Sequence, residues 1–235
     1  MRFWERASGS IKKTICDALK HRYHKNGLVR EEFSVPDYSL LCANLEQRGF
    51  SVRFFPTAEE ASAYLQSVIR GKTVGAGGSE TLRTMGLLDA LAVHNTVYSH
   101  SIPGVDQDSA MTQAASAQVY LSSLNGLSET GELINIDGRC NRVSATLHGH
   151  EAVYFIVGRN KIAPTFDQAL WRARNIAAPQ NARRLNCSTP CALRGDRCYD
   201  CSSPGRICRG LVVLWSPPLG VDRMEVILVD QDLGF

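Results

Sequence analysis

The spacing of hydrophobic residues changes repeatedly along the chain between the period of a strand and that of a helix. Short runs rich in Val, Ile, Leu and Phe are typical of strands. Such runs predict strands at residues 51–55, 73–76, 95–99, 119–124, 132–136, 142–147, 152–157, 211–215 and 224–229. Asp137-Gly138 supplies a turn between two of them. Because many of these strands alternate with helical stretches, we expect an α/β fold with a mostly parallel sheet and helices on both faces.

Helical periodicity and capping residues predict where the helices lie. They are expected over residues 9–20, 38–48, 57–70, 79–92, 108–118 and 165–177. Thr57 and Glu60 form a capping box, Ser79 is an N-cap, and Pro179 should end the last helix. We therefore predict an N-terminal helical appendage over residues 1–34 and one α/β domain over residues 35–235, which includes a Cys-rich loop at 187–208.

Composition excludes several classes of protein. The chain has 235 residues, 44% of them hydrophobic and 21% charged, which is enough apolar material for a core without disulfides. A net charge of +3 is too small to argue for a nucleic acid or a membrane surface as partner. No run approaches the roughly 18 apolar residues of a membrane span, and Lys12 and Lys13 interrupt any secretory signal. A cytoplasmic location is the resulting expectation.

A glycine turn follows the predicted strand at 73–76. Residues 75–81 read Gly-Ala-Gly-Gly-Ser-Glu-Thr. Ligands bind open α/β sheets at the carboxyl ends of strands, and a helix that begins there offers free N–H groups to an anion. The candidate phosphate- or carboxylate-binding residues are Gly77, Gly78, Ser79, Glu80 and Thr81. The alternative is a tight turn that needs glycine for its conformation alone. A dinucleotide site is less favoured, because Glu80 stands where the third glycine of that fingerprint should be.

Two polar segments follow other predicted strand ends. The candidate ligand-binding residues in them are Asn125, Glu129, Asn135, Asp137, Asn141, Arg142, Asn160 and Lys161. Glu129 could act as an acid, a base or a nucleophile, and Arg142 could clamp a carboxylate or phosphate. The alternative is a hairpin with Asn and Asp at its turns and a surface Glu–Arg pair. If the functional interpretation holds, these side chains should converge with the glycine turn on one cleft.

Five of the eight cysteines lie within residues 187–208. Cys191, Cys198, Cys201 and Cys208 are arranged symmetrically about a C-x-x-C pair, and Cys187 is the spare. Four thiolates can hold an iron–sulfur cluster or bind Zn²⁺, although the spacing matches neither a zinc ribbon nor a bacterial ferredoxin. A redox dithiol at Cys198 and Cys201 and packed, reduced cysteines without metal stay open. The six histidines show no metalloprotease spacing and are interpreted as structural or surface residues.

Several of these motifs together resemble the LUD (lactate-utilisation) domain family, in its LutC/YkgG-like group. The resemblance rests on residues 74–87, 125–143 and 158–161, and the Cys-bearing branch is matched by 178–181, 189–191, 200–208 and 233–235. It spans about residues 35–235. Two departures stand out: Cys140 replaces a glycine before Asn-Arg-Val, and residues 193–196 read Leu-Arg-Gly-Asp in place of the usual Thr-Gly.

The resemblance implies a NagB/RpiA/CoA-transferase-like fold and a link to the oxidation of L-lactate to pyruvate beside iron–sulfur partner subunits. We therefore expect a component of 2-hydroxy acid oxidation that binds a small anion and holds an iron–sulfur cluster, with zinc or no metal as alternatives. A second hypothesis is a non-catalytic partner or scaffold subunit whose Cys loop binds structural zinc or serves in docking. A third is a CoA-transferase-like enzyme with Glu129 as its nucleophile.

Overall fold

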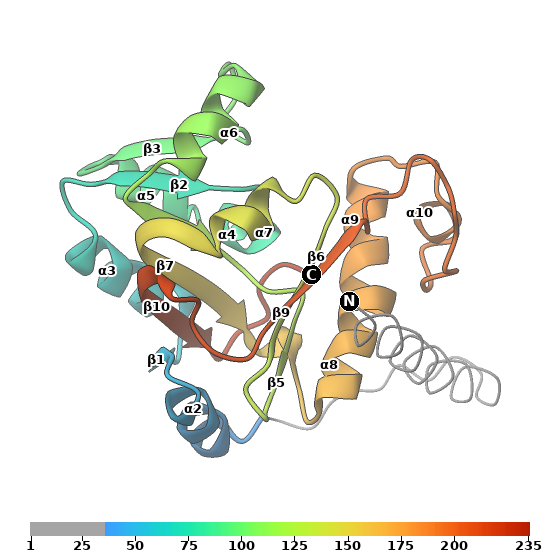
Figure 1. The fold of residues 1–235 in the computed structure, drawn as a ribbon, viewed down its shortest axis with the longest axis horizontal. Coiled ribbons are helices and arrows are strands. Elements are labelled where there is room, and N and C mark those ends of the chain that lie inside the picture. The colour runs from blue at the N-terminus through green and yellow to red at the C-terminus, as the bar shows by residue number, and fades with distance from the viewer. Residues whose placement is uncertain (1–35) are drawn as a thin grey trace, which may run out of the picture. The chain divides into compact units, whose positions relative to one another are not determined.

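The computed structural model describes residues 36–235, and its largest element is a six-stranded sheet (Figure 1). The strand order is β1-β10-β7-β4-β2-β3, and every neighbouring pair is parallel. The strands are β1 (Ser51–Phe55), β2 (Thr73–Ala76), β3 (Thr96–Ser99), β4 (Val119–Ser122), β7 (His148–Gly158) and β10 (Gly220–Val229). The predicted α/β fold with a mostly parallel sheet is confirmed.

A second, smaller sheet has four strands in the order β8-β5-β6-β9. They are β5 (Gly126–Ser128), β6 (Leu133–Asp137), β8 (Ile162–Ala163) and β9 (Gly210–Leu214). β6 pairs antiparallel with both β5 and β9, whereas β5 and β8 are parallel. The hydrophobic pattern does not separate these strands from the large sheet, because a strand buried on both faces has the same composition in either sheet.

Helices cover the sheets and connect the strands. They are α2 (Tyr38–Gln47), α3 (Ala58–Val68), α4 (Glu80–Thr84), α5 (Leu87–Ala92), α6 (Gln107–Ala115), α7 (Asn141–Ala145), α8 (Phe166–Arg172), α9 (Ala178–Arg184) and α10 (Pro190–Arg194). The predicted caps form: the Thr57 and Ser79 hydroxyls accept the N–H groups of Glu60 and Leu82. The predicted helix over 79–92 divides at Gly86, which has a φ of +59°. The appendage predicted at 1–34, with its helix at 9–20, lies outside the described residues.

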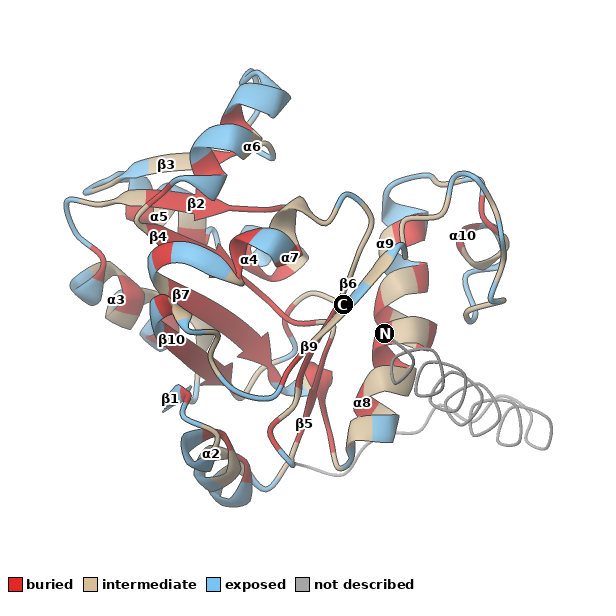
Figure 2. Cartoon of the chain, in the orientation of Figure 1, coloured by how far each residue is buried: buried red, intermediate tan, exposed pale blue. Residues whose placement is uncertain are grey.

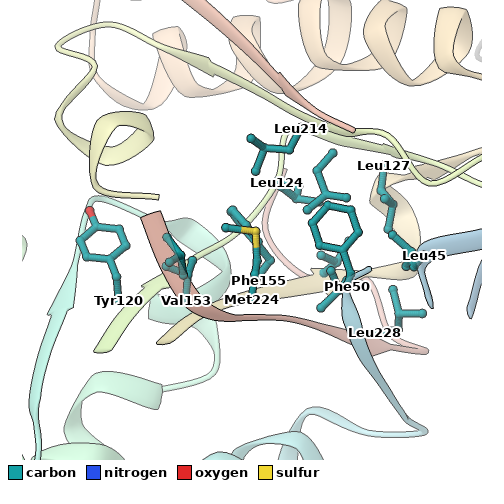
Figure 3. Packing of buried hydrophobic residues seen from close by; sticks show 14 of the residues in the cluster. Leu45, Phe50, Tyr120, Leu124, Leu127, Val153, Phe155, Leu214, Met224 and Leu228 are labelled. Carbon is teal, nitrogen blue, oxygen red and sulfur yellow. The ribbon is translucent and has the colours of Figure 1, made fainter. Parts of the chain in front are cut away.

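The main core lies between the two sheets. Phe155 and Met224 of the large sheet are buried with Leu124, Leu127 and Leu214 from the side of the small sheet (Figure 3). The other face of the large sheet packs against α3, α4 and α5, and the other face of the small sheet packs against α8. Figure 2 shows the central strands of the large sheet largely buried, whereas the edge strands β1 and β3 are mostly exposed or half-buried.

The parallel order places the carboxyl ends of the large sheet's strands along one edge. Residues 77–79 follow β2, residues 123–125 follow β4, and residues 159–161 follow β7. In an open parallel sheet this edge is where ligands bind. The fold therefore brings three of the predicted polar segments to one side of the molecule.

The strand predicted at 142–147 is wrong. These residues form α7 and the turn after it, because the Asp137 carboxylate accepts the N–H groups of Cys140 (3.2 Å) and Val143 (3.3 Å) and starts a helix. Asp137-Gly138 is therefore not a hairpin turn. Cys140 adopts a left-handed conformation (φ +64°) just before α7, a conformation that glycine adopts at lower cost.

The predicted helix end at Pro179 is also wrong. The chain continues from α8 through a π-helical segment, Ala173–Ala177, into α9. Pro179 lies in the first turn of α9. A proline has no N–H group to donate to the preceding turn. The π-helical segment before Pro179 already alters the backbone hydrogen bonds at that point, so the helix continues past the proline. No helix within residues 36–235 is both long and apolar enough to cross a membrane.

Phe155→Ala should lower the free energy of unfolding by about 3–5 kcal/mol, because it empties a fully buried position between the two sheets. Phe54→Ala is the control, since Phe54 is 42% exposed and should lose only about 0.5–1.5 kcal/mol from its ring pair with Tyr38. Urea denaturation measures both. Equal losses would contradict the placement of the core.

Candidate functional site

Lys161 joins three strand ends at the carboxyl edge of the large sheet. Its ammonium nitrogen lies 2.7 Å from Thr81 Oγ1 and 2.9 Å from Ser123 Oγ. The Ser123 hydroxyl in turn donates to the Ile156 carbonyl at 2.6 Å. Thr81, Ser123 and Lys161 are all buried. This set of hydrogen bonds ties the glycine turn to the ends of β4 and β7.

Only the Glu80 carboxylate acts on the charge of Lys161 among the described residues, and it does so without direct contact. Among residues 36–235 no acidic group forms a salt bridge with Lys161. Burial lowers the pKa of Lys161 well below its ordinary value, and the positive charges of Arg172 and Arg142 lower it further. The local environment therefore disfavours the charged form of this side chain more than water does.

Arg142 fastens the small sheet to this edge. Its guanidinium donates to acceptors on the β4–β5 connection and on β6: Asn135 Oδ1 (2.6 Å), the Ile136 carbonyl (2.9 Å), the Ser123 carbonyl (3.3 Å) and Asn125 Oδ1 (3.4 Å). The Asp137 carboxylate lies 3.5 Å from its Nε. Arg142 is thus engaged by the protein itself, and clamping an anion would require these bonds to be exchanged.

The glycine turn packs closely on its neighbours. A Cβ at Gly77 would lie 3.0 Å from Arg142 Cβ and 3.1 Å from the Tyr120 hydroxyl, and one at Gly78 would lie 3.4 Å from His100 Nε2. A glycine at position 77 therefore lets the turn lie close to the side chains of Arg142 and Tyr120. Burial raises the pKa of the Tyr120 phenol to about 12, against the opposing charge of Arg142. Tyr120 thus stays a neutral hydroxyl beside the turn at neutral pH.

His100 and Arg139 are members of this site that sequence reasoning missed. The Nδ1 atom of His100 is buried and has no hydrogen-bond partner within the described part of the chain. Burial lowers the pKa of His100, the nearby Arg139 lowers it further, and Asp137 opposes them. His100 directly follows β3, so the strand-end rule that selected the other residues could have found it. No sequence signal points to Tyr120, which lies within β4.

Glu129 does not join the glycine turn. It follows β5, at the opposite end of that strand from Asn125. Its carboxylate accepts the Asp37 N–H (3.3 Å) and its carbonyl accepts the Asn44 side chain (2.7 Å), so it lies against α2. The expectation that Glu129 shares a cleft with Gly77 and Arg142 is not met.

Other predicted residues make mainly local bonds. Glu80 forms a salt bridge with Arg83, and Ser79 caps α4. Asn160 accepts the Leu233 N–H (3.1 Å) and donates to the Gly234 carbonyl (3.1 Å). Asn141 begins α7, close to Arg142 in the chain. The structure therefore brings together Gly77, Thr81, Asn125, Asn135, Asp137, Arg142 and Lys161.

A cavity of about 250 Å³ contains the four predicted metal ligands. Its lining includes Cys191, Cys198, Cys201 and Cys208, whereas Cys187 is not part of it. The remaining lining residues are Ile136, Arg174, Ala178, Pro179, Ala182, Thr189, Arg206, Ile207, Arg209, Gly210 and Leu211. The seven cysteines of the described chain are all free of disulfides. Within residues 36–235 no three His, Cys, Asp or Glu side chains lie close enough together to hold a metal ion.

Positive groups and N–H donors surround these thiols. Arg174 Nη2 lies 3.8 Å from the Cys198 sulfur, which also accepts the Asp200 N–H at 3.4 Å. The Arg206 guanidinium donates to the carbonyls of Cys208 (3.1 Å) and Cys201 (2.9 Å).

The cavity and the Arg142 cluster share strand β6. Ile136 lines the cavity, and its carbonyl accepts from Arg142 at 2.9 Å. The next carbonyl, of Asp137, accepts the N–H of Arg209, another cavity residue, at 2.9 Å. A shift of β6 would therefore change both the hydrogen bonds of Arg142 and the lining of the cysteine cavity.

Removing the buried charge at Arg142 should be costly. We expect Arg142→Ala to lower the free energy of unfolding by about 3–5 kcal/mol, because it leaves the Asp137 and Asn135 side chains without their partner in a largely buried place. Chemical denaturation provides the measurement, with exposed Arg70→Ala as control. A loss no larger than that of the control would show that Arg142 does not fasten the two sheets.

The pKa of Lys161 predicts a pH dependence of stability. Because the folded-state pKa lies below the ordinary 10.5, the unfolded chain binds the proton that the folded chain lacks between these two values. The stability of the wild type relative to Lys161→Met should therefore rise as the pH increases through this window. Thermal unfolding across a pH series tests this. Half-buried Lys72→Met is the control for lysine removal, since the Lys72 ammonium is paired with Glu151 at 2.6 Å. A difference that stays constant with pH would contradict it.

Comparisons with known proteins place the chain in a family. The model of the LUD domain matches residues 38–229. A DUF162 family protein from Deinococcus radiodurans is similar in structure, with a TM-score of 0.48 and 16% identity over 86% of this chain and 99% of that one. Translation initiation factor eIF-2B from Pyrococcus horikoshii OT3 is more distant, with a TM-score of 0.37 and 14% identity over 47% of this chain and 48% of that one. No curated protein matches. The chain belongs to the LUD domain family.

Proposed function

We propose that this LUD-domain protein takes part in the oxidation of a 2-hydroxy acid of the L-lactate class to the 2-oxo acid, and that Cys191, Cys198, Cys201 and Cys208 hold an iron–sulfur cluster. One observation carries the proposal: these four thiols, drawn from two six-residue arms around a C-x-x-C pair, line one cavity. The family supports the general link to lactate utilisation. The cluster and the oxidation step are our proposal.

The chemistry of the lining fits such a group. Four thiolates are the usual ligands of an iron–sulfur cluster, and they need compensating positive charge when they are removed from water. Arg174, Arg206 and Arg209 provide that charge. Ile136, Ile207 and Leu211 supply apolar walls that would limit access of water. A bound cluster would supply one-electron transfer.

Binding requires the cysteine segment to draw its sulfurs inward, because the described residues hold no preformed metal-binding group. The segment between Cys201 and Cys208 is composed largely of Ser, Pro, Gly and Arg, and it forms no helix or strand. Such a segment has little core of its own. Metal binding would then contribute to the ordering of this part of the fold.

The small anion is proposed to bind at the carboxyl edge of the large sheet. The glycine turn at Gly77 and Gly78 supports a carboxylate there. So do the Nδ1 atom of His100, which has no hydrogen-bond partner among residues 36–235, and the nearby Arg139. Oxidation of a 2-hydroxy acid releases two electrons, so an acceptor is needed. We assign that role to an iron–sulfur partner subunit and place the protein in the cytoplasm.

Zinc at the same four thiols is the second candidate. It would make the chain a non-catalytic partner or scaffold subunit, and it is favoured by the same four-cysteine lining, because Zn²⁺ takes four thiolates in structural sites. The CoA-transferase-like alternative loses support, since Glu129 lies against α2, away from the glycine turn.

Anaerobic purification, with analysis of iron, sulfide and zinc and a visible spectrum, tests the proposal. We expect iron and sulfide with thiolate-to-iron absorbance in the wild type, loss of most of both in Cys201→Ser, and retention in Cys187→Ser. Cys187 is the matched control, because it lies in the same segment but outside the cavity. Zinc in place of iron would favour the scaffold function. No metal, or an equal loss in both variants, would refute a site at these four thiols.

A further inference from the structure

Three exposed residues and one half-buried tyrosine lie beside the cysteines that line the cavity. We call Leu193, Arg194, Arg197 and Tyr199 the arginine face. Leu193 is 74% exposed, and both arginines are exposed as well. Tyr199 stands between Cys198 and Cys201 in the chain, so this face borders the cavity that those two thiols line. Figure 2 shows that the segment containing α10 is more exposed to solvent than the central strands of the large sheet.

The two arginines are held in place by one ring. The guanidinium carbon of Arg194 lies 4.9 Å from the centre of the Tyr199 ring, and that of Arg197 lies 5.4 Å from it. The Tyr199 hydroxyl donates to Asp196 at 2.5 Å. Within residues 36–235 neither guanidinium has a salt-bridge partner. Both arginines are therefore positioned in advance and can pair with carboxylates from another molecule.

The charge of the chain is unevenly distributed around this face. Residues 174–209 contain seven arginines and two aspartates, whereas the whole chain has a net charge of only +3. A local excess of positive charge beside an exposed leucine and a tyrosine is typical of a protein-binding surface, where Arg and Tyr contribute much of the binding energy. A nucleic acid fits this surface less well, because its negatively charged backbone would be repelled by Asp196 and would not pack against Leu193.

The positive charge of the arginine face also indicates which kind of molecule binds it. Residues 1–32 contain eight basic and four acidic residues, so this segment of the chain is a poor electrostatic match for the arginine face. An acidic surface is the complementary one. We propose that the arginine face docks a partner protein through a patch of acidic residues with an apolar residue among them, which places that partner beside the cysteine cavity. This inference goes beyond the proposed function and does not depend on the cluster.

A model ligand tests the face in the full-length protein. The probe is a short fluorescein-labelled peptide of alternating glutamate and leucine, and its binding is followed by fluorescence anisotropy. Arg194→Glu and Arg197→Glu should each weaken binding roughly tenfold, because each reverses one charge against the peptide. Arg70→Glu makes the same charge change at an exposed arginine on another part of the surface and should alter affinity by no more than about twofold. Binding to the wild type should also fall with added salt.

Three results of this experiment would overturn the proposal. They are failure of the wild type to bind the peptide, weakening of binding by Arg70→Glu as large as that by the other two variants, and tighter binding of single-stranded oligothymidylate than of the peptide. Sedimentation of the protein alone identifies a second copy as the occupant if the wild type self-associates and Arg197→Glu does not, which also overturns it. Iron and zinc contents of the same variants are measured in parallel. These metal contents show whether the wild type lacks a cluster, and the peptide titration shows separately whether the arginine face binds an acidic partner.

Discussion

The largely buried guanidinium of Arg142 is the constraint on which the arrangement of the two sheets depends. A positive charge inside a protein is tolerated only when its hydrogen bonds are satisfied. Arg142 finds its acceptors on the connection after β4 and along β6, and Asp137 supplies the opposing charge. To meet this requirement, the end of β6 must lie against the carboxyl edge of the large sheet. The small sheet is thereby held in one position by polar contacts as well as by the core between the sheets.

This arrangement has a consequence for function. Because β6 lies between the Arg142 cluster and the cysteine cavity, two chemically different regions become neighbours. On one side are the glycine turn, His100 and Arg139, where we propose that a small anion binds. On the other are four thiols with arginines beside them. A redox function would use both regions, since a substrate and an electron-transfer group need to be close together.

Much of this fold could be predicted from local patterns, because strand composition, caps and the alternation of elements are encoded within short segments. The expectation that polar residues after β2 and β7 would meet rests on the parallel order alone, and Thr81 and Lys161 do meet. Ser123, which joins them, was predicted to lie inside the strand at 119–124. Glu129 does not, because β5 is only three residues long and carries the chain away toward α2. The helix after Asp137 was missed because a β-rich composition was overridden by one carboxylate cap. Tyr120 could not have been found, since its role arises from packing on Gly77 across neighbouring strands.

Iron K-edge X-ray absorption on the anaerobically isolated protein is the most direct test of the central claim, that the four cysteines form one cluster site. It reports the atoms bound to iron, independently of how much metal the sample contains. Our account predicts a first shell composed of sulfur and a second shell containing iron, as in a cluster held by thiolates. A first shell of oxygen or nitrogen, or iron without a neighbouring iron, would contradict it.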